Sequence, residues 1–172
     1  RVSNVATRLV PGLLGDTMKP ETGQDMPPWM LHALKDKGLK ERIGPATNPR
    51  IAEFFSHTGL GGYTPDSVPW CSAAMNAWME ESGYRGTRRA NARSWTTWGD
   101  SLDEPRVGAI VVLWRGDPNS HQGHVALWTA PLGPASMVLY GGNQNNQVGY
   151  ATYGTSRILA IRWPSEADRL PP

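Results

Sequence analysis

A single cysteine is the most reactive side chain that the sequence offers. Cys71 stands in TPDSVPWCSAAMNAWMEESG, residues 64–83, where a proline-rich turn gives way to apolar residues at helical spacing. Gly83 ends that pattern, so Cys71 is predicted to lie at a helix N-terminus. The unpaired N–H groups there favour negative charge and lower the pKa of a thiol. Cys71 is therefore a candidate nucleophile, and the alternative is a buried cysteine that only fills space.

A thiol nucleophile needs a base, and His124 is the best placed of four histidines. It opens the segment GHVALWTA, in which His124, Ala126 and Trp128 share one face of a predicted strand. A rigid strand can hold an imidazole against a helix terminus. His32 and His57 lie in predicted helices without an obvious partner. We interpret them as structural or solvated residues.

The base needs a third group that fixes its orientation, commonly Asp or Asn. The segment LYGGNQNNQV offers Asn143, Gln144, Asn145 and Asn146 at the end of the next predicted strand. Asn145 and Asn146 are typical of a turn, because Asn tolerates left-handed backbone. Asn143 stands closest to the strand and is our predicted orienting residue. The order Cys, His, Asn is that of the variant triad of papain-like proteases.

Other residues are predicted to bind the substrate around this triad. The backbone N–H groups of Cys71 and Ser72 are candidates for stabilising an oxyanion. The expected substrate contacts are Trp70, Asp66, Trp128 and His121. Two more tryptophans, Trp95 and Trp98, are at least as compatible with the core. His121 and His124 lack the His-Glu-x-x-His pattern and an evident third ligand, so neither a metal nor another cofactor is expected.

The elements that must position these residues predict an α+β fold. Two helices are expected before Cys71, in PPWMLHALKDKGL (27–39) and NPRIAEFFSHTG (48–59), the latter with Asn48 as N-cap and Pro49 in the first helical position. After residue 105 short strands follow, separated by turn residues: 108–115, 123–130, 136–142, 147–154 and 156–163. Helices followed by strands favour helices packed on one side of an antiparallel sheet of about five strands.

Length and composition indicate one domain and exclude several classes of protein. We predict an N-terminal tail or linker over 1–26, the catalytic domain over 27–164 and a C-terminal tail over 165–172. One cysteine excludes an intramolecular disulfide scaffold. Seventeen basic and fifteen acidic residues are scattered, so no nucleic-acid partner is expected. The one basic cluster, RGTRRANAR (85–93), is a solvated loop or a weak attraction to an anionic polymer. No apolar run predicts membrane insertion.

Several of these segments together resemble a known group of enzymes. The motifs are PWCSAAMNAW, GHVALW, GGNQNNQV, NPRIAEFF, SWTTWG and RILAIRWP. They resemble the CHAP and NlpC-like superfamily of papain-fold cell-wall hydrolases over residues 27–164, and more closely a bacterial and phage branch with Trp-Cys and Gly-Gly-Asn-Gln motifs. The sequence departs from other members in two places: Trp70 precedes the cysteine instead of Asp, and Gly141 and Gly142 stand where many CHAP enzymes have Glu before the Asn.

The resemblance implies a papain-like fold and a thiol amidohydrolase that cuts peptidoglycan. Cys71 would be the nucleophile, His124 the base and Asn143 the orienting residue. The cleaved bond would lie within the stem peptide or be the N-acetylmuramoyl-L-alanine amide. Such an enzyme would act as a monomer in the bacterial cell wall or periplasm, as a lysin or as a delivered antibacterial toxin, for instance of a type VI secretion system, with an immunity protein as partner. The alternatives are a cysteine acyltransferase and a non-catalytic cell-wall-binding module.

Overall fold

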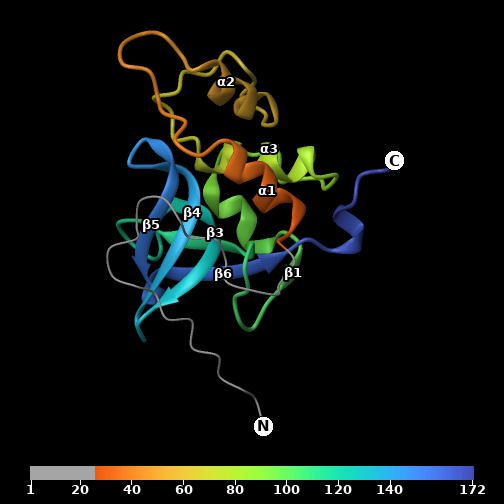
Figure 1. Ribbon diagram of the computed structural model, residues 1–172, viewed down its shortest axis with the longest axis vertical. Helices are drawn as coiled ribbons and strands as arrows, with labels where there is room; N and C mark the ends of the chain where they lie inside the picture. The colour runs from red at the N-terminus through yellow and green to blue at the C-terminus, as the bar shows by residue number, and fades with distance from the viewer. Residues whose placement is uncertain (1–25) are drawn as a thin grey trace.

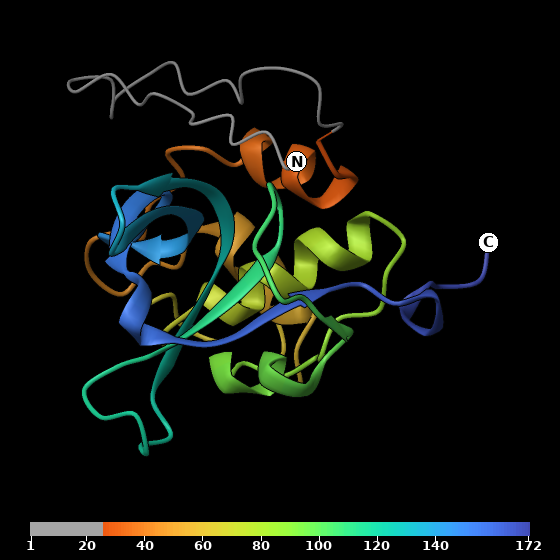
Figure 2. The ribbon, with the colours of Figure 1, turned by 90° about the horizontal axis from the view of Figure 1, so that it is seen from below.

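Helices cover one side of a six-stranded antiparallel sheet in the computed structural model, which describes residues 26–172 (Figures 1 and 2). The sheet order is β1-β6-β2-β3-β4-β5. The strands are β1 Asp100–Ser101, β2 Ile110–Trp114, β3 Gly123–Leu132, β4 Ser136–Gln144, β5 Gln147–Gly154 and β6 Ile158–Trp163. The three α-helices all precede the strands in the chain, which confirms the predicted α+β class.

The helices form where the sequence supplies their first residues. Helix α1 spans Pro28–Lys35, α2 spans Pro49–Ser56 and α3 spans Cys71–Glu81. Proline begins α1 and α2, where its missing N–H is no loss. The side chain of Asn48 accepts a hydrogen bond from the N–H of Arg50 and caps α2, as predicted. Helix α3 ends just before Gly83, whose φ of 86° only glycine adopts without cost.

Helix α3 lies at the centre of the molecule and is buried along most of its length. It contacts α1 and α2 on one side and strands β3 and β4 on the other, while α2 lies farther from the sheet (Figure 1). Alternate residues of the strands enter the main core, among them Val112, Val125 and Leu127. Their neighbours, including Leu113 and Ala126, form a second apolar cluster on the other face of the sheet. The alternation predicted for β3 is therefore confirmed.

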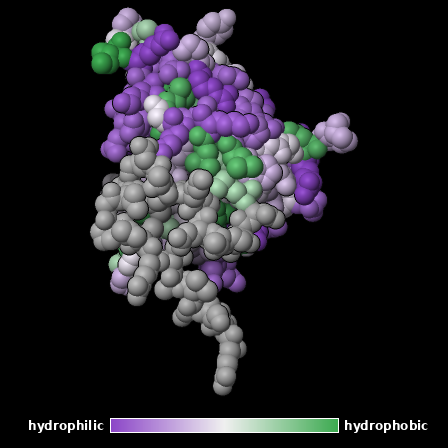
Figure 3. Space-filling view, viewed as in Figure 1, coloured by the Kyte–Doolittle hydropathy of each residue, from purple (hydrophilic) through white to green (hydrophobic). Residues whose placement is uncertain are grey.

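The molecular surface is mostly polar. Figure 3 shows hydrophilic residues over most of the described surface in that view, with hydrophobic residues in small patches. The large apolar side chains that stand almost fully exposed are Ile43 and Tyr63, both in loops that flank α2. No helix within residues 26–172 is long and apolar enough to cross a membrane.

Sequence reasoning found the five main strands but missed the short elements. β1 and the 3₁₀ helices η1 (Ala92–Thr97), η2 (Thr155–Arg157) and η3 (Glu166–Asp168) are additional. The predicted tail over 1–26 lies outside the described residues, except for Met26. The predicted C-terminal tail over 165–172 contains η3 and pairs with the chain after α3, since the N–H of Leu170 donates to Gly83 O and Tyr84 forms a bridge with Arg169.

Candidate active site

The thiol of Cys71 lies at the first residue of α3, as the sequence predicts. Trp70, the residue at the N-cap position, makes no side-chain capping hydrogen bond. The N–H groups of the first helical turn therefore remain available to a group placed beside them. Cys71 itself is 5% exposed, so the residue is shielded from bulk water.

The sulfur of Cys71 lies beside the start of β3. At this point β3 and β4 are not paired, which leaves a gap in the ladder of backbone hydrogen bonds. Pairing between these strands begins only at Leu127 and Tyr140, so the start of β3 has no partner strand on that side. The N–H of Trp128 points to β2, where it bonds Ala109 O. Because N–H directions alternate along a strand, the N–H of Val125 faces the gap. There it donates a hydrogen bond to the sulfur of Cys71.

The environment of Cys71 lowers its pKa. Burial is the largest contribution and by itself raises the pKa, because it disfavours the thiolate. The charge of His124 and its hydrogen bond to the thiol act in the opposite direction, together with the N–H groups of Val125 and Ser72. The lowering contributions together outweigh burial, so the site favours a thiolate.

His124 is buried and is held by Gln144, not by the predicted Asn143. Nε2 of His124 lies 3.0 Å from Oε1 of Gln144. The amide nitrogen of Gln144 donates to the carbonyls of Leu139 and Gly149, at 3.2 and 2.6 Å. The amide oxygen must therefore face His124, so that Nε2 carries the proton and donates it. In the neutral imidazole this leaves Nδ1 as the acceptor for the thiol proton of Cys71.

A local irregularity of β4 explains why the neighbouring residue takes this position. Asn143 has a φ of 55° in the left-handed region, and the pairing of β4 with β5 shifts between Gly141 and Gln144. An extra residue in a strand reverses which side chains face each side of the sheet. The prediction placed Asn143 directly after a strand over 136–142, whereas Asn143 lies within β4 at a bulge. Asn145 and Asn146 also have positive φ, in agreement with their predicted turn.

The two glycines before Asn143 permit close packing at the gap. A Cβ added to Gly142 would lie 2.8 Å from the ring of Trp70 and 2.9 Å from the side chain of Ala74 on α3. A Cβ added to Gly141 would lie 2.8 Å from Cβ of Ala126 on β3. All three distances are shorter than real contacts allow. The Gly-Gly pair therefore lets β4 pass directly beside the helix that carries Cys71.

Two residues predicted to bind substrate are structural instead. Trp70 is fully buried, stacks on Phe54 with ring centroids 6.1 Å apart, and donates from Nε1 to a carboxylate oxygen of Glu41. Asp66 is 4% exposed, and its carboxylate accepts hydrogen bonds from the N–H groups of Arg42 and Asn48, each at 3.0 Å. Neither side chain can reach a ligand. Both fix the loops that precede Cys71.

The remaining predicted contacts lie at different distances from the thiol. Trp128 is half-buried against the second apolar cluster and stands four residues, about 13 Å, along β3 from His124. His121 is exposed in the loop before β3 and stays a predicted rim contact. The hydroxyl of Ser72 is buried, donating to Arg89 O and accepting from Trp95. Only the backbone of Ser72 faces the sulfur.

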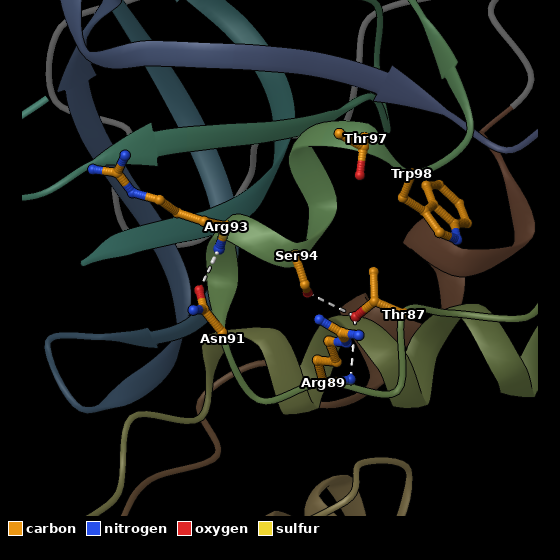
Figure 4. A pocket seen from close by; sticks show the side chains of 7 residues that line it. All are labelled: Thr87, Arg89, Asn91, Arg93, Ser94, Thr97 and Trp98. Carbon is orange, nitrogen blue, oxygen red and sulfur yellow. Dashed lines mark hydrogen bonds between the residues drawn. The ribbon is translucent and has the colours of Figure 1, made fainter. Parts of the chain in front are cut away.

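The loop before His124 is held by Arg93, which sequence reasoning passed over as part of a solvated basic cluster. Its guanidinium donates to the carbonyls of Gln122, Pro118 and Asp117 at 2.8, 2.9 and 3.1 Å. Arg93 also borders a polar depression of about 550 Å³ (Figure 4). That depression is lined by Thr87, Arg89, Asn91, Arg93, Ser94, Thr97 and Trp98, and it contains neither Cys71 nor His124. Trp95 and most of Trp98 belong to the core.

The comparisons with known proteins add distant structural likenesses. No protein-family model and no curated protein matches the chain. One similar solved structure is described as similar to a lipoprotein of the NLP/P60 family, from Staphylococcus aureus subsp. aureus Mu50. It is 17% identical, with a TM-score of 0.48, over 88% of this chain. The chain spans only 46% of the length of that protein.

Proposed function

We propose that this chain is a cysteine amidohydrolase whose reaction is carried by Cys71, His124 and Gln144. The observation that supports this proposal is that the buried imidazole of His124 is hydrogen-bonded to the fixed amide oxygen of Gln144 and lies close enough to the thiol of Cys71 to lower its pKa. Nucleophile, base and orienting group are the three parts that thiol catalysis on amides requires. The third position needs no acidic residue to orient the base, because the amide oxygen of Gln144 accepts a hydrogen bond from Nε2 of His124.

The reaction would proceed through an acyl-enzyme. Cys71 thiolate attacks the amide carbonyl carbon, and the oxygen of the tetrahedral intermediate is stabilised by N–H groups at the start of α3, that of Cys71 first. His124, now protonated, gives its Nδ1 proton to the departing amine nitrogen, and the C–N bond breaks. His124 then takes a proton from water, which attacks the thioester. The carbon–sulfur bond breaks, and the acid and the thiolate are released.

The proposed substrate is peptidoglycan, and its support is the sequence resemblance to cell-wall hydrolases. Within this proposal, cleavage falls in the stem peptide or at the amide between sugar and peptide. Action outside the cytoplasm, as a lysin or as a delivered toxin with an immunity partner, is part of the same proposal. The competing acyltransferase would use the same acyl-enzyme and differ only in the final acceptor. The buried, fully connected Cys71, His124 and Gln144 argue against a non-catalytic binding module.

Digestion of purified sacculi followed by mass spectrometry of the soluble products tests this function. The wild-type protein is expected to release either free stem peptides, which identify the amidase, or shortened muropeptides, which identify the endopeptidase. Cys71→Ala should fold normally and release nothing. A folded Cys71→Ala protein with wild-type activity, or a wild-type protein that cleaves no sacculus from a panel of wall types, would contradict the proposal. Repeating the digestion with free amines distinguishes the two reactions by their final acceptor. An acyltransferase joins the acyl group to the amine, whereas a hydrolase releases the free acid.

A further inference from the structure

Two arginines stand beside the proposed catalytic residues without an acidic partner. Arg157 follows β5 and is partly buried, and Arg115 follows β2 and is exposed. Within residues 26–172, no carboxylate forms an ion pair with either of them. The acidic residue nearest to Arg115 in the sequence is Asp117. Its carboxylate accepts a hydrogen bond from the N–H of Asn119 in its own loop, at 2.7 Å.

Arg157 reaches the site through Tyr153. The hydroxyl of Tyr153 donates to Oε1 of Gln144 at 3.1 Å, and its ring lies 5.5 Å from that of His124. The guanidinium of Arg157 lies 5.3 Å from the centroid of the Tyr153 ring. It is fixed there by two hydrogen bonds, from Nε and Nη2 to Trp114 O, at 3.1 and 3.0 Å. Its Nη1 has no hydrogen-bond partner among the described residues.

Arg115 faces the same side of the sheet. Leu113 pairs with His124 across β2 and β3, and paired residues project to the same face. Arg115 is two residues beyond Leu113, and its N–H continues the ladder to Gln122 O at 3.3 Å. Side chains two residues apart on a strand share a face. His124, Arg115 and the Tyr153–Arg157 pair therefore border one region.

The charges of Cys71, Arg157 and Arg115 all act on the hydroxyl of Tyr153. Burial is the main reason that the pKa of Tyr153 is raised to about 12, and the charge of Cys71 raises it further, while Arg157 and Arg115 lower it. Both guanidinium groups and the thiolate are thus close enough to Tyr153 to act on its hydroxyl. At neutral pH the hydroxyl stays protonated and keeps donating to Gln144.

We propose that Arg157 and Arg115 bind a carboxylate of the substrate next to the amide that Cys71 attacks. A guanidinium fork recognises a carboxylate through paired N–H groups, and a half-buried cation without a counter-ion gains most from one. The substrate class is then a peptide with a free carboxylate close to the scissile bond. This inference rests on the proposed function, and it assigns specificity to two residues outside the catalytic group.

Binding to an inactive protein tests the inference separately from catalysis. The probes are two synthetic stem peptides, one whose glutamyl residue carries a free carboxylate and one in which that carboxylate is a carboxamide. Calorimetry with Cys71→Ala should show about tenfold tighter binding of the acid peptide, since hydrogen bonds to charged groups are the stronger ones. Arg115→Gln should remove most of that difference while leaving affinity for the amide peptide unchanged. Arg157→Lys keeps the positive charge but lacks the paired N–H groups of a guanidinium. It should therefore reduce the difference in affinity between the two peptides.

Arg85→Gln is the matched control. Arg85 is also exposed and without an ion pair in the described chain, but it lies beyond the far end of α3, about 16 Å from Cys71 along the helix. It should leave the preference for the acid peptide intact. Equal affinities for the two peptides, no binding of the acid peptide, or the same loss in Arg85→Gln would overturn the inference. Selective binding by a wild-type protein that cleaves neither peptide would instead contradict only the proposed hydrolysis.

Discussion

Gln144 determines which nitrogen of His124 faces the thiol. Its amide is held by two backbone carbonyls and by Tyr153, so its oxygen cannot turn away without breaking several hydrogen bonds. The imidazole therefore keeps Nδ1 toward Cys71 without an acidic residue in the site. This arrangement links the reactivity of the sulfur to a residue that never touches it.

Replacing Gln144 by Ala should make Cys71 less reactive at low pH. Without the amide oxygen, His124 loses its fixed orientation, and its charge and hydrogen bond no longer favour the thiolate. The pKa of Cys71 then rises toward that of a free thiol, about 8.5, which is less than about 1% ionised near pH 6. We expect alkylation at about pH 6 to slow at least tenfold, since each unit of pKa changes the thiolate fraction about tenfold. The rates of the two proteins should converge above about pH 9.

Asn143→Gly is the control for this prediction. Glycine accepts the positive φ of Asn143, so the bulge and the position of Gln144 should persist. The alkylation profile should then match that of the wild type. If Asn143→Gly shifts the pH profile of alkylation as strongly as Gln144→Ala does, Asn143 and not Gln144 orients His124.

At the residue scale the sequence predicts where the proposed nucleophile and base lie, but not the residue that holds the base. Cys71 and His124 could be chosen because one begins a helical pattern and the other an alternating strand. Gln144 could not, because one bulge decides whether residue 143 or 144 faces His124. The αL preference of Asn in GGNQNN was the available signal, since it applies to Asn143 as well as to the two turn residues.

At the scale of elements, the site exists because β4 leaves β3 and passes against α3. Gly142 is the closest point of that approach. A side chain there would have to displace either the ring of Trp70 or the first turn of α3. The pair of glycines in the sequence is thus a packing requirement, and not only a turn signal.

Gly142→Ala should therefore lower both stability and thiol reactivity. Overpacking of this kind costs about 1–3 kcal/mol of unfolding free energy. The displaced turn also moves Cys71 away from His124, so alkylation at about pH 6 should slow. Urea denaturation and the alkylation rate measure the two effects. Gly59→Ala is the matched control, because no atom lies within 4 Å of the added Cβ and the residue follows α2, outside the site. Equal behaviour of the two variants would contradict the role given to Gly142.

Sequence periodicity predicted the elements better than their contacts. Strands with alternating burial and helices with capping residues carry local signals, and these elements are where they were expected. The burial of Trp70 and Asp66 depends on segments distant in the chain, namely α2 and the loop after α1. Local patterns do not contain such information, so the prediction that both residues contact the substrate is wrong.

At the scale of the whole molecule, α2 is attached through α3 and a group of charged residues rather than through the sheet (Figure 1). Arg50 on α2 bonds Asp36, just after α1, at 2.9 Å and Glu81, at the end of α3, at 2.7 Å. Burial acts to lower the pKa of Arg50, but hydrogen bonds and charge from Glu81 and Asp36 outweigh it and raise the pKa. Arg50 is thus permanently charged and joins all three helices.

Arg50→Ala should cost about 2–4 kcal/mol of unfolding free energy, because it leaves two shielded carboxylates facing each other without their cation. Arg50→Lys should recover only part of the loss, since lysine lacks the bidentate fork. Arg42→Ala is the control: its exposed side chain forms no ion pair in the described chain, and the change should stay within about 0.5 kcal/mol. Urea denaturation of the three variants measures these differences. Equal losses in Arg50→Ala and Arg42→Ala would show that apolar packing alone, including Phe54 against Trp70, holds α2 in place.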